Sequence, residues 1–261
     1  MSSVPTSVAM GTPGAGVPLV LLHGIGGRAC GWAPVQQALA AAGQASLAWD
    51  MPGYGESPTI SPYDFDGLAD ALAVLLDAQG LQQAVLVGHS LGGMVALQMW
   101  ARHPQRVAGL VLVASSPAFG HGSGDFQKAF VAQRLAPLEA GRSMQDVAAG
   151  LIPTMVAPGY SGPGLALALA CMGSITPAAY KAALGALVQF EQRAALPTVE
   201  VPTLCIAGEH DRTAAPSVVQ RMAEKIPKAQ YQCLNGVGHL LTFEQPERFA
   251  DALLPFLRSF Q

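Results

Sequence analysis

The sequence predicts an α/β protein with a mostly parallel central sheet, helices on both faces of that sheet and an inserted helical cap. Short, continuous apolar runs recur along the chain and alternate with segments whose apolar residues have helical spacing. Because a strand that is buried on both faces is apolar throughout, these runs indicate parallel strands covered by helices. The alternation stops in residues 118–197, where helical spacing interrupted by prolines predicts the cap.

The bulk composition is that of a large globular domain. The chain has 261 residues, of which 51% are hydrophobic and 12% charged, and its net charge is −3. This length suits one α/β domain that carries an insertion. Lysine and arginine are scattered singly, so we expect no binding to nucleic acid or to an anionic membrane. The longest apolar runs are far shorter than a membrane span.

The N-terminus and the cysteines predict a cytoplasmic protein. Residues 1–16 have neither the basic start nor the apolar core of a signal peptide. The cysteines lie far apart and form no CxxC pair: Cys30, Cys171, Cys205 and Cys233. Two of them fall in expected core strands, so we expect reduced thiols in a cytosolic protein.

The core elements follow one another in a regular order. A short strand is expected at residues 7–10, and further strands at 18–22, 45–49, 84–87, 107–114, 203–207 and 230–234. Helices are expected at residues 32–42, 63–79, 215–225 and 246–259, with a further helix that ends near residue 102. Residues 1–117 and 198–261 therefore form the predicted core domain, and residues 118–197 form the cap.

The stretch from residue 85 to residue 96 predicts a nucleophile. Three apolar residues lead into Gly88, Ser90 follows two positions later, and Gly92 precedes a run of residues that favour a helix. A strand that reverses sharply into a helix crowds its own backbone, and glycines relieve this crowding because they lack a Cβ. The residue at the apex has its side chain pushed into solvent, so we expect the Ser90 hydroxyl above the end of a sheet.

A serine nucleophile requires a general base that takes its proton. His239 lies in a glycine-rich turn just after the final strand, and a parallel sheet places that turn at the same edge as Ser90. The other histidines flank tight turns, end a helix or lie in loops: His23, His89, His103, His121 and His210. We therefore predict His239 as the base.

The base in turn requires an acid that orients it. Asp211 follows the strand at residues 203–207, and we prefer it to the neighbouring Glu209. A simpler interpretation has Asp211 capping the helix that starts near Ala215, and the two interpretations are compatible in part.

The charge that develops on a substrate oxygen requires two backbone N–H groups. The N–H of Leu91 is favoured, because it comes directly after the nucleophile at a helix start. The second N–H would come from Ile25, in the glycine turn that follows His23 and Gly24. That glycine turn lacks the partner residues of a phosphate-binding loop, and no His, Cys or acidic residues show metal-ligand spacing on one element.

Together these motifs resemble those of the α/β-hydrolase family. The matching segments are HGIGG at 23–27, DMPGYGES at 50–57, GHSLGG at 88–93, GEHD at 208–211 and GH at 238–239. The order Ser90, Asp211, His239 is similar to the triad order of that family. The resemblance is greatest to small bacterial esterases, enol-lactonases and carbon–carbon hydrolases with a helical cap, and it implies an enzyme without a cofactor. The family usually opens with a two-strand hairpin, which here would be truncated.

The expected reaction is acyl transfer to water by Ser90, His239 and Asp211, with the oxyanion held by Ile25 and Leu91. The expected substrate is a small-to-medium, mainly apolar carboxylic ester or lactone. Candidate substrate-binding residues lie beside the oxyanion turn or in the cap: Trp32, Phe119, Phe130, Arg134 and Met155. Arg142 is a second cap arginine suited to a carboxylate-bearing substrate.

Three alternative functions remain open from the sequence. A carbon–carbon hydrolase acting on vinylogous diketones would use the same three residues, and so would a cofactor-free perhydrolase. A ligand-binding member of the same fold is the third alternative, because a fold does not determine a function. The apolar composition also permits a homodimer.

Overall fold

The computed structural model describes residues 4–12, 17–119 and 124–260. The strands are β1 (Ser7–Met10), β2 (Leu19–Leu22), β3 (Ser46–Trp49), β4 (Ala84–His89), β5 (Val107–Val113), β6 (Thr203–Gly208) and β7 (Gln230–Leu234). The α-helices are α1 (Ala33–Ala41), α2 (Phe65–Ala78), α3 (Leu91–Arg102), α4 (Asp125–Glu139), α5 (Met144–Leu151), α6 (Pro163–Gly173), α7 (Pro177–Leu187), α8 (Pro216–Ala223), α9 (Leu241–Glu244) and α10 (Pro246–Leu257). Short 3₁₀ helices are η1 (Ala29–Trp32), η2 (Pro104–Arg106), η3 (Ile152–Thr154), η4 (Arg193–Thr198) and η5 (Arg258–Phe260).

The strands form one sheet in the order β1-β3-β2-β4-β5-β6-β7. Neighbouring strands are parallel except at one edge, where β1 runs antiparallel to β3. Each crossover between parallel strands passes through a helical segment, as a parallel pair requires. The predicted α/β class with a mostly parallel sheet is confirmed.

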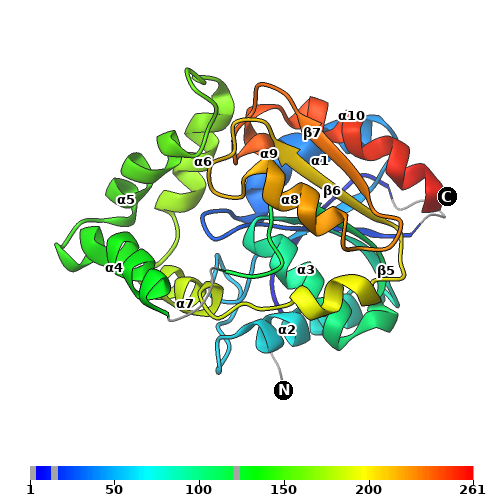
Figure 1. The fold of residues 1–261 in the computed structure, drawn as a ribbon, viewed down its shortest axis with the longest axis horizontal. Coiled ribbons are helices and arrows are strands. Elements are labelled where there is room, and N and C mark those ends of the chain that lie inside the picture. The colour runs from blue at the N-terminus through cyan, green and yellow to red at the C-terminus, as the bar shows by residue number, and fades with distance from the viewer. Residues whose placement is uncertain (1–3, 13–16, 120–123, 261) are drawn as a thin grey trace.

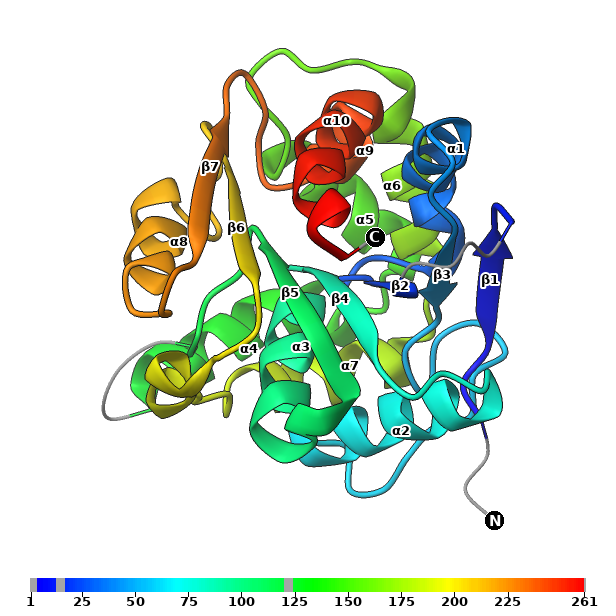
Figure 2. The ribbon, with the colours of Figure 1, turned by 90° about the vertical axis from the view of Figure 1, so that its right-hand side faces the viewer.

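Alternate residues of the buried strands enter two separate cores. In β5, Leu110 and Leu112 pack with α2, α3 and α8, whereas Val111 and Val113 pack with α1 and α10. Figure 2 shows the two layers, with α1 and α10 on one face of the sheet and α2 and α3 on the other. Burial on both faces explains why the strand sequences are apolar throughout.

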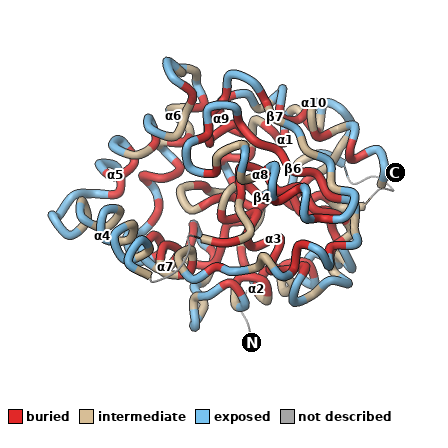
Figure 3. Tube along the Cα trace, in the orientation of Figure 1, coloured by how far each residue is buried: buried red, intermediate tan, exposed pale blue. Residues whose placement is uncertain are grey.

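Helices α4 to α7, here called the α4–α7 segment, lie together at one side of the molecule (Figure 1). Its inner residues are buried and its outer surface is exposed, and α4 has no fully buried residue (Figure 3). Outside the named strands, Ala118 and Glu191, which flank this segment in the chain, make an isolated antiparallel bridge.

Among the described residues, no single helix is long and apolar enough to cross a membrane. Taken together, helices α6 and α7 have the length and apolar composition of a membrane span, but they are bent by 98° where they meet.

Two details of the fold differ from, or add to, the expected elements. β1 is the one strand described before β2, and it pairs with β3 through four residues, so the hairpin expected of the family is reduced to a short edge strand. The short helix α9 was not expected, because its four residues lie between His239 and Pro246 and are too few to show a period.

Candidate active site

The carboxyl ends of four parallel strands meet at one edge of the sheet. In the register, Leu22 of β2 lies beside Gly88 of β4, and Gly208 of β6 lies beside Leu234 of β7. The loops that follow these strands therefore converge at this edge, as in other open parallel sheets. They contribute residues 23–27, Ser90, Asp211 and His239.

Ser90 occupies a strained turn between β4 and α3. Its backbone has φ 54° and ψ −119°, a conformation that non-glycine residues rarely adopt. A Cβ on Gly88 would lie 2.3 Å from the carbonyl oxygen of Gly92, and a Cβ on Gly92 would lie 2.2 Å from that of Leu22. The spacing of these glycines in the sequence therefore has the expected steric cause. The Ser90 carbonyl accepts a hydrogen bond from the Ser115 hydroxyl at 2.8 Å.

Ser90, His239 and Asp211 form a continuous hydrogen-bonded chain. His239 Nε2 lies 3.1 Å from Ser90 Oγ, and His239 Nδ1 lies 2.8 Å from Asp211 Oδ2. With Nδ1 protonated and donating to the carboxylate, Nε2 is free to accept the serine proton. Both His239 and Asp211 are buried, which protects this pairing from water.

The second oxygen of Asp211 serves the local backbone. Oδ1 accepts the N–H groups of Thr213 and Ala214 at 2.7 and 2.9 Å, just before α8 begins. The two interpretations of Asp211 made from the sequence thus both describe part of its contacts. These two bonds fix the carboxylate so that Oδ2 faces His239.

Two further histidines hold the loops around Ser90. His23 Nδ1 donates to the Gly24 carbonyl at 2.7 Å, and its Nε2 accepts the N–H of Met51 at 3.0 Å. His89 Nε2 donates to the carbonyl of His239 at 2.8 Å. Burial lowers the pKa of His23 to about 4, and burial together with the nearby His239 lowers the pKa of His89 to about 3, so both are neutral near pH 7.

His23 thus bonds within its own turn, whereas His89 reaches the His239 loop. His103 pairs with Asp70 at 2.7 Å, and His210 lies on the surface near Glu209. His121 lies outside the described residues.

The two backbone segments expected to bind an oxyanion flank Ser90. Leu91 is the first residue of α3, where the N–H has no acceptor within the helix. Ile25 lies in the turn at residues 23–27 and lines the pocket described below. A Cβ on Gly24 would lie 3.1 Å from the Cβ of Ser90, so this turn packs directly against the serine.

Glu244 ties the His239 loop to the α4–α7 segment. Its buried carboxylate accepts the N–H of Ala157 at 2.8 Å and that of Gly238 at 2.9 Å. The N–H of His239 donates to the carbonyl of Met155 at 2.7 Å. Burial raises the pKa of Glu244 above its usual value. No sequence signal pointed to this residue, because its partner Ala157 lies 87 residues away along the chain.

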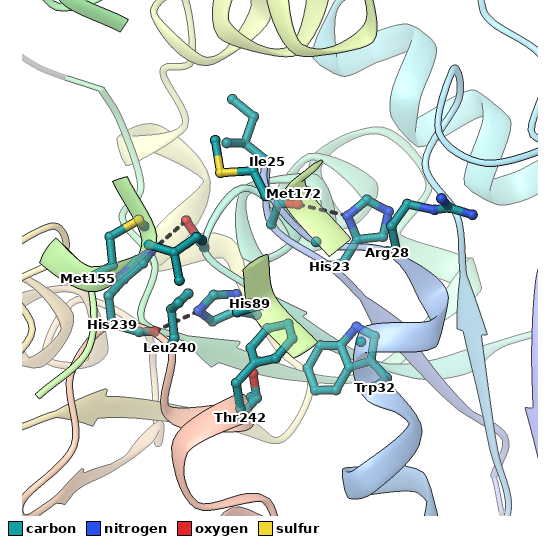
Figure 4. A pocket seen from close by; sticks show the side chains of 18 of the residues that line it. His23, Ile25, Arg28, Trp32, His89, Met155, Met172, His239, Leu240 and Thr242 are labelled. Atoms are coloured by element: carbon teal, nitrogen blue, oxygen red, sulfur yellow. Dashed lines mark hydrogen bonds between the residues drawn. The ribbon is translucent and has the colours of Figure 1, made fainter. Parts of the chain in front are cut away.

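A pocket with an empty volume of about 590 Å³ opens beside Ser90 and His239. Its walls come from the loop at residues 23–32, from α5 to α6 and from the segment after His239 (Figure 4). The apolar side chains on these walls are Ile25, Trp32, Leu151, Ile152, Met155, Ala168, Met172, Leu240 and Phe243.

The predicted substrate-binding residues fall into two groups. Trp32 and Met155 line the pocket (Figure 4). Phe119, Phe130 and Arg134 are not among its lining residues. The Phe119 and Phe130 rings meet edge to face with their centroids 4.8 Å apart, and the Arg134 guanidinium lies over the Phe130 ring at 5.0 Å. Their aromatic character thus serves packing between α4 and the preceding loop.

Arg142 lies in an exposed turn after α4 and does not line the pocket either. Among the pocket-lining residues, Arg28 carries the formal charge, and that charge is already matched. Its guanidinium donates to both oxygens of Asp50, at 2.8 and 3.1 Å, and to the Ser174 hydroxyl at 3.2 Å. The surface of the pocket is therefore mainly apolar. Among its described lining residues, the one cationic side chain, Arg28, is paired with a carboxylate.

Within the described ranges, no group of three or more His, Cys, Asp or Glu side chains has an arrangement suited to a metal ion. The polar side chains that line the pocket are His23, Arg28, His89, Ser90, His239 and Thr242.

Comparison with known proteins adds a family and several relatives. The family described as alpha/beta hydrolase fold matches residues 17–246. The chain is 33% identical over 254 residues to the dihydrolipoyllysine-residue acetyltransferase component of an acetoin cleaving system from Pseudomonas putida, covering 93% of this chain and 64% of that protein. It therefore spans less than two thirds of that relative's length.

Two further matches cover nearly the full length of both proteins. The chain is 32% identical over 252 residues to a pimeloyl-acyl-carrier-protein methyl ester esterase from Xanthomonas campestris, covering 94% of this chain and 96% of that protein. Among solved structures, a thermophilic esterase from Thermogutta terrifontis superposes with a TM-score of 0.86 at 26% identity, covering 98% of this chain and 93% of the other.

Proposed function

Because this chain belongs to the α/β-hydrolase family, we propose that it is a serine hydrolase of small-to-medium, mainly apolar carboxylic esters or lactones. The observation that carries this proposal is the hydrogen-bonded chain of Ser90, His239 and Asp211 at the floor of an apolar pocket. Relatives that are named as esterases support an ester as the substrate.

In the proposed mechanism, Ser90 Oγ attacks the substrate carbonyl while His239 Nε2 takes its proton. Asp211 holds the Nδ1–H and stabilises the positive charge that forms on the imidazole. The backbone N–H groups of Leu91 and Ile25 bind the oxyanion. His239 then protonates the leaving alcohol, and a water molecule activated by the same nitrogen releases the acid from the acyl-enzyme.

In this proposal the α4–α7 segment is the cap that shapes the acyl site. Leu151, Ile152, Met155 and Met172 form the wall opposite the core, and none of them carries a charge. Burial of each additional methylene of an acyl chain against such a wall contributes about 0.8 kcal/mol. The value of kcat/KM should therefore rise about fourfold per methylene until the chain fills the pocket.

The test is a series of p-nitrophenyl esters with increasing acyl length, together with lactones and a dienoic diketone. The variant Ser90→Ala should lose about 10⁴-fold or more of kcat and keep its fold by circular dichroism. Ser116→Ala is a matched control, because its hydroxyl bonds only the nearby Ala118 backbone in the described structure.

Near wild-type ester hydrolysis by Ser90→Ala would refute the assignment of the nucleophile. A strong preference for the diketone, with the same dependence on Ser90, would replace ester hydrolysis by carbon–carbon hydrolysis. Peroxide-dependent turnover of a carboxylic acid in place of ester hydrolysis would identify a perhydrolase. Tight binding of a ligand without turnover of any compound would identify a binding protein.

A further inference from the structure

Two cysteines from distant parts of the chain meet at the rim of the pocket. Cys30 lies in η1 of the core and Cys171 lies in α6 of the α4–α7 segment, 141 residues further along. Their sulfur atoms are 3.8 Å apart, and both are free thiols. This pairing was not expected from the sequence, in which the cysteines are widely spaced and no CxxC motif occurs.

The local packing brings these two elements unusually close. A Cβ on Gly31 would lie 3.2 Å from the Cys171 sulfur, so the glycine next to Cys30 allows the approach of α6. Arg28 reaches Ser174 just beyond α6 at 3.2 Å, which adds a polar contact between the same two segments. The sulfur atoms need to approach by roughly 1.8 Å to reach the bond length of a disulfide, about 2.05 Å.

The two thiols differ in exposure and acidity. Cys30 is exposed, whereas Cys171 is buried, with 2% of its surface exposed. The hydrogen bond from the Cys171 thiol, together with the positive charge of Arg28, lowers the pKa of Cys30 to about 6, and the same hydrogen bond raises the pKa of Cys171. An exposed thiolate beside a buried thiol is the arrangement of an oxidant-sensitive cysteine and its resolving partner.

We propose that Cys30 and Cys171 form a redox modification site, at which a hydroperoxide oxidises the pair to a disulfide that fastens the α4–α7 segment to the core. The neighbours of both cysteines, Arg28, Gly31 and Met172, line the pocket, so the new bond closes directly on its rim.

The reaction proceeds in two balanced steps. The Cys30 thiolate attacks one oxygen of hydrogen peroxide, the O–O bond breaks, and hydroxide leaves as the sulfenic acid forms. The Cys171 sulfur then displaces the sulfenic oxygen, which departs as water with the Cys171 proton. Two electrons pass from the sulfurs to the peroxide, and once the hydroxide takes up the proton that Cys30 had lost, the oxygen atoms end as two water molecules.

The first test is peptide mass spectrometry of the native protein, treated with a small excess of hydrogen peroxide and then alkylated. A peptide pair joined through residues 30 and 171 should appear with the loss of two hydrogen atoms and should disappear after reduction with dithiothreitol. Cys233→Ser should form the same link. In the Cys171→Ser variant, Cys30 should instead be oxidised to sulfinic acid, because the thiol that would convert its sulfenic acid to a disulfide is missing.

The second test measures whether the bond restrains the fold. A cross-link across 141 residues should raise the midpoint of thermal unfolding by about 5–10 °C in the oxidised protein, and reduction should reverse the shift. Neither measurement depends on ester hydrolysis. A native protein in which Cys30 is over-oxidised while Cys171 remains open to alkylation after unfolding would overturn the proposal. A linked protein with an unchanged midpoint would overturn the fastening role.

Discussion

Acid should destabilise this protein through His23, a buried residue at the wall of the pocket. Its Nδ1–H donates to the Gly24 carbonyl and its Nε2 accepts the Met51 N–H, so a second proton on the ring would face another donor. Burial lowers the pKa of His23 from 6.5 to about 4. Below pH 6.5 the unfolded chain therefore binds a proton that the folded chain excludes.

The sign and size of the effect follow from this difference. The contribution of neutral His23 to the free energy of unfolding is fully present above pH 6.5. This contribution is lost as the pH falls from 6.5 to about 4. At about 1.36 kcal/mol per unit of pKa, the difference of 6.5 − 4 corresponds to about 3 kcal/mol. This is a large part of the 5–15 kcal/mol that stabilises a typical domain.

The measurement is urea unfolding of the wild type and of His23→Gln at several pH values between 7 and 4. Glutamine keeps an acceptor oxygen near the position of Nε2 and does not titrate. The free energy of unfolding of the wild type should fall more steeply, so that the difference between the two proteins changes by about 3 kcal/mol over this range. Parallel curves for the two proteins would show that His23 is not the titrating group.

Substitutions at Gly92 and Glu244, each with a matched comparison variant, probe the scaffold of the site. Gly92→Ala places a Cβ 2.2 Å from a backbone oxygen of β2 and should prevent stable folding. Gly185 lies in α7 with open space around it, so Gly185→Ala should raise the free energy of unfolding by up to about 1 kcal/mol. An equal change in the midpoint of thermal unfolding for both variants would contradict the steric explanation of the Ser90 turn. Glu244→Ala leaves two buried N–H donors without their acceptor and should cost about 2–4 kcal/mol of unfolding free energy, with Glu244→Gln retaining part of it through its remaining oxygen. A loss for glutamine as large as for alanine would mean that the hydrogen-bond geometry, and not the presence of an acceptor, is what matters there.

Elements with strong local signals were predicted well from the sequence. The mainly apolar runs became β2 to β6, because burial on both faces favours apolar residues at most strand positions. The turn at Ser90 was predictable because its steric requirement falls on glycines within two residues of the serine. Asp211 and His239 were predictable because each lies in the loop after a strand, β6 or β7, whose place in the sheet follows from the alternation of elements.

Features that depend on distant packing were not predictable. Phe130 and Met155 both appeared in the sequence as apolar residues at helical spacing, yet Met155 lines the pocket whereas Phe130 packs beside Phe119. The direction in which each helix of the α4–α7 segment faces is set by its packing neighbours, and α6, which has no charged residue, carries no periodic signal for that direction. The contacts of Glu244 with Ala157 and of Cys171 with Cys30 were hidden because these partners lie 87 and 141 residues away along the chain.

The separation of the proposed catalytic residues along the chain also determines when the site can form. Ser90 and His239 are 149 residues apart, whereas β1 to β5 form a contiguous set of neighbours in the sheet. During synthesis from the N-terminus, the strained serine turn can therefore assemble against β2 and β5 while no base is yet present. The pairing with Asp211 and His239 requires β6 and β7. In a chain that is still incomplete, the Ser90 hydroxyl is therefore held in its turn but has no base to take its proton.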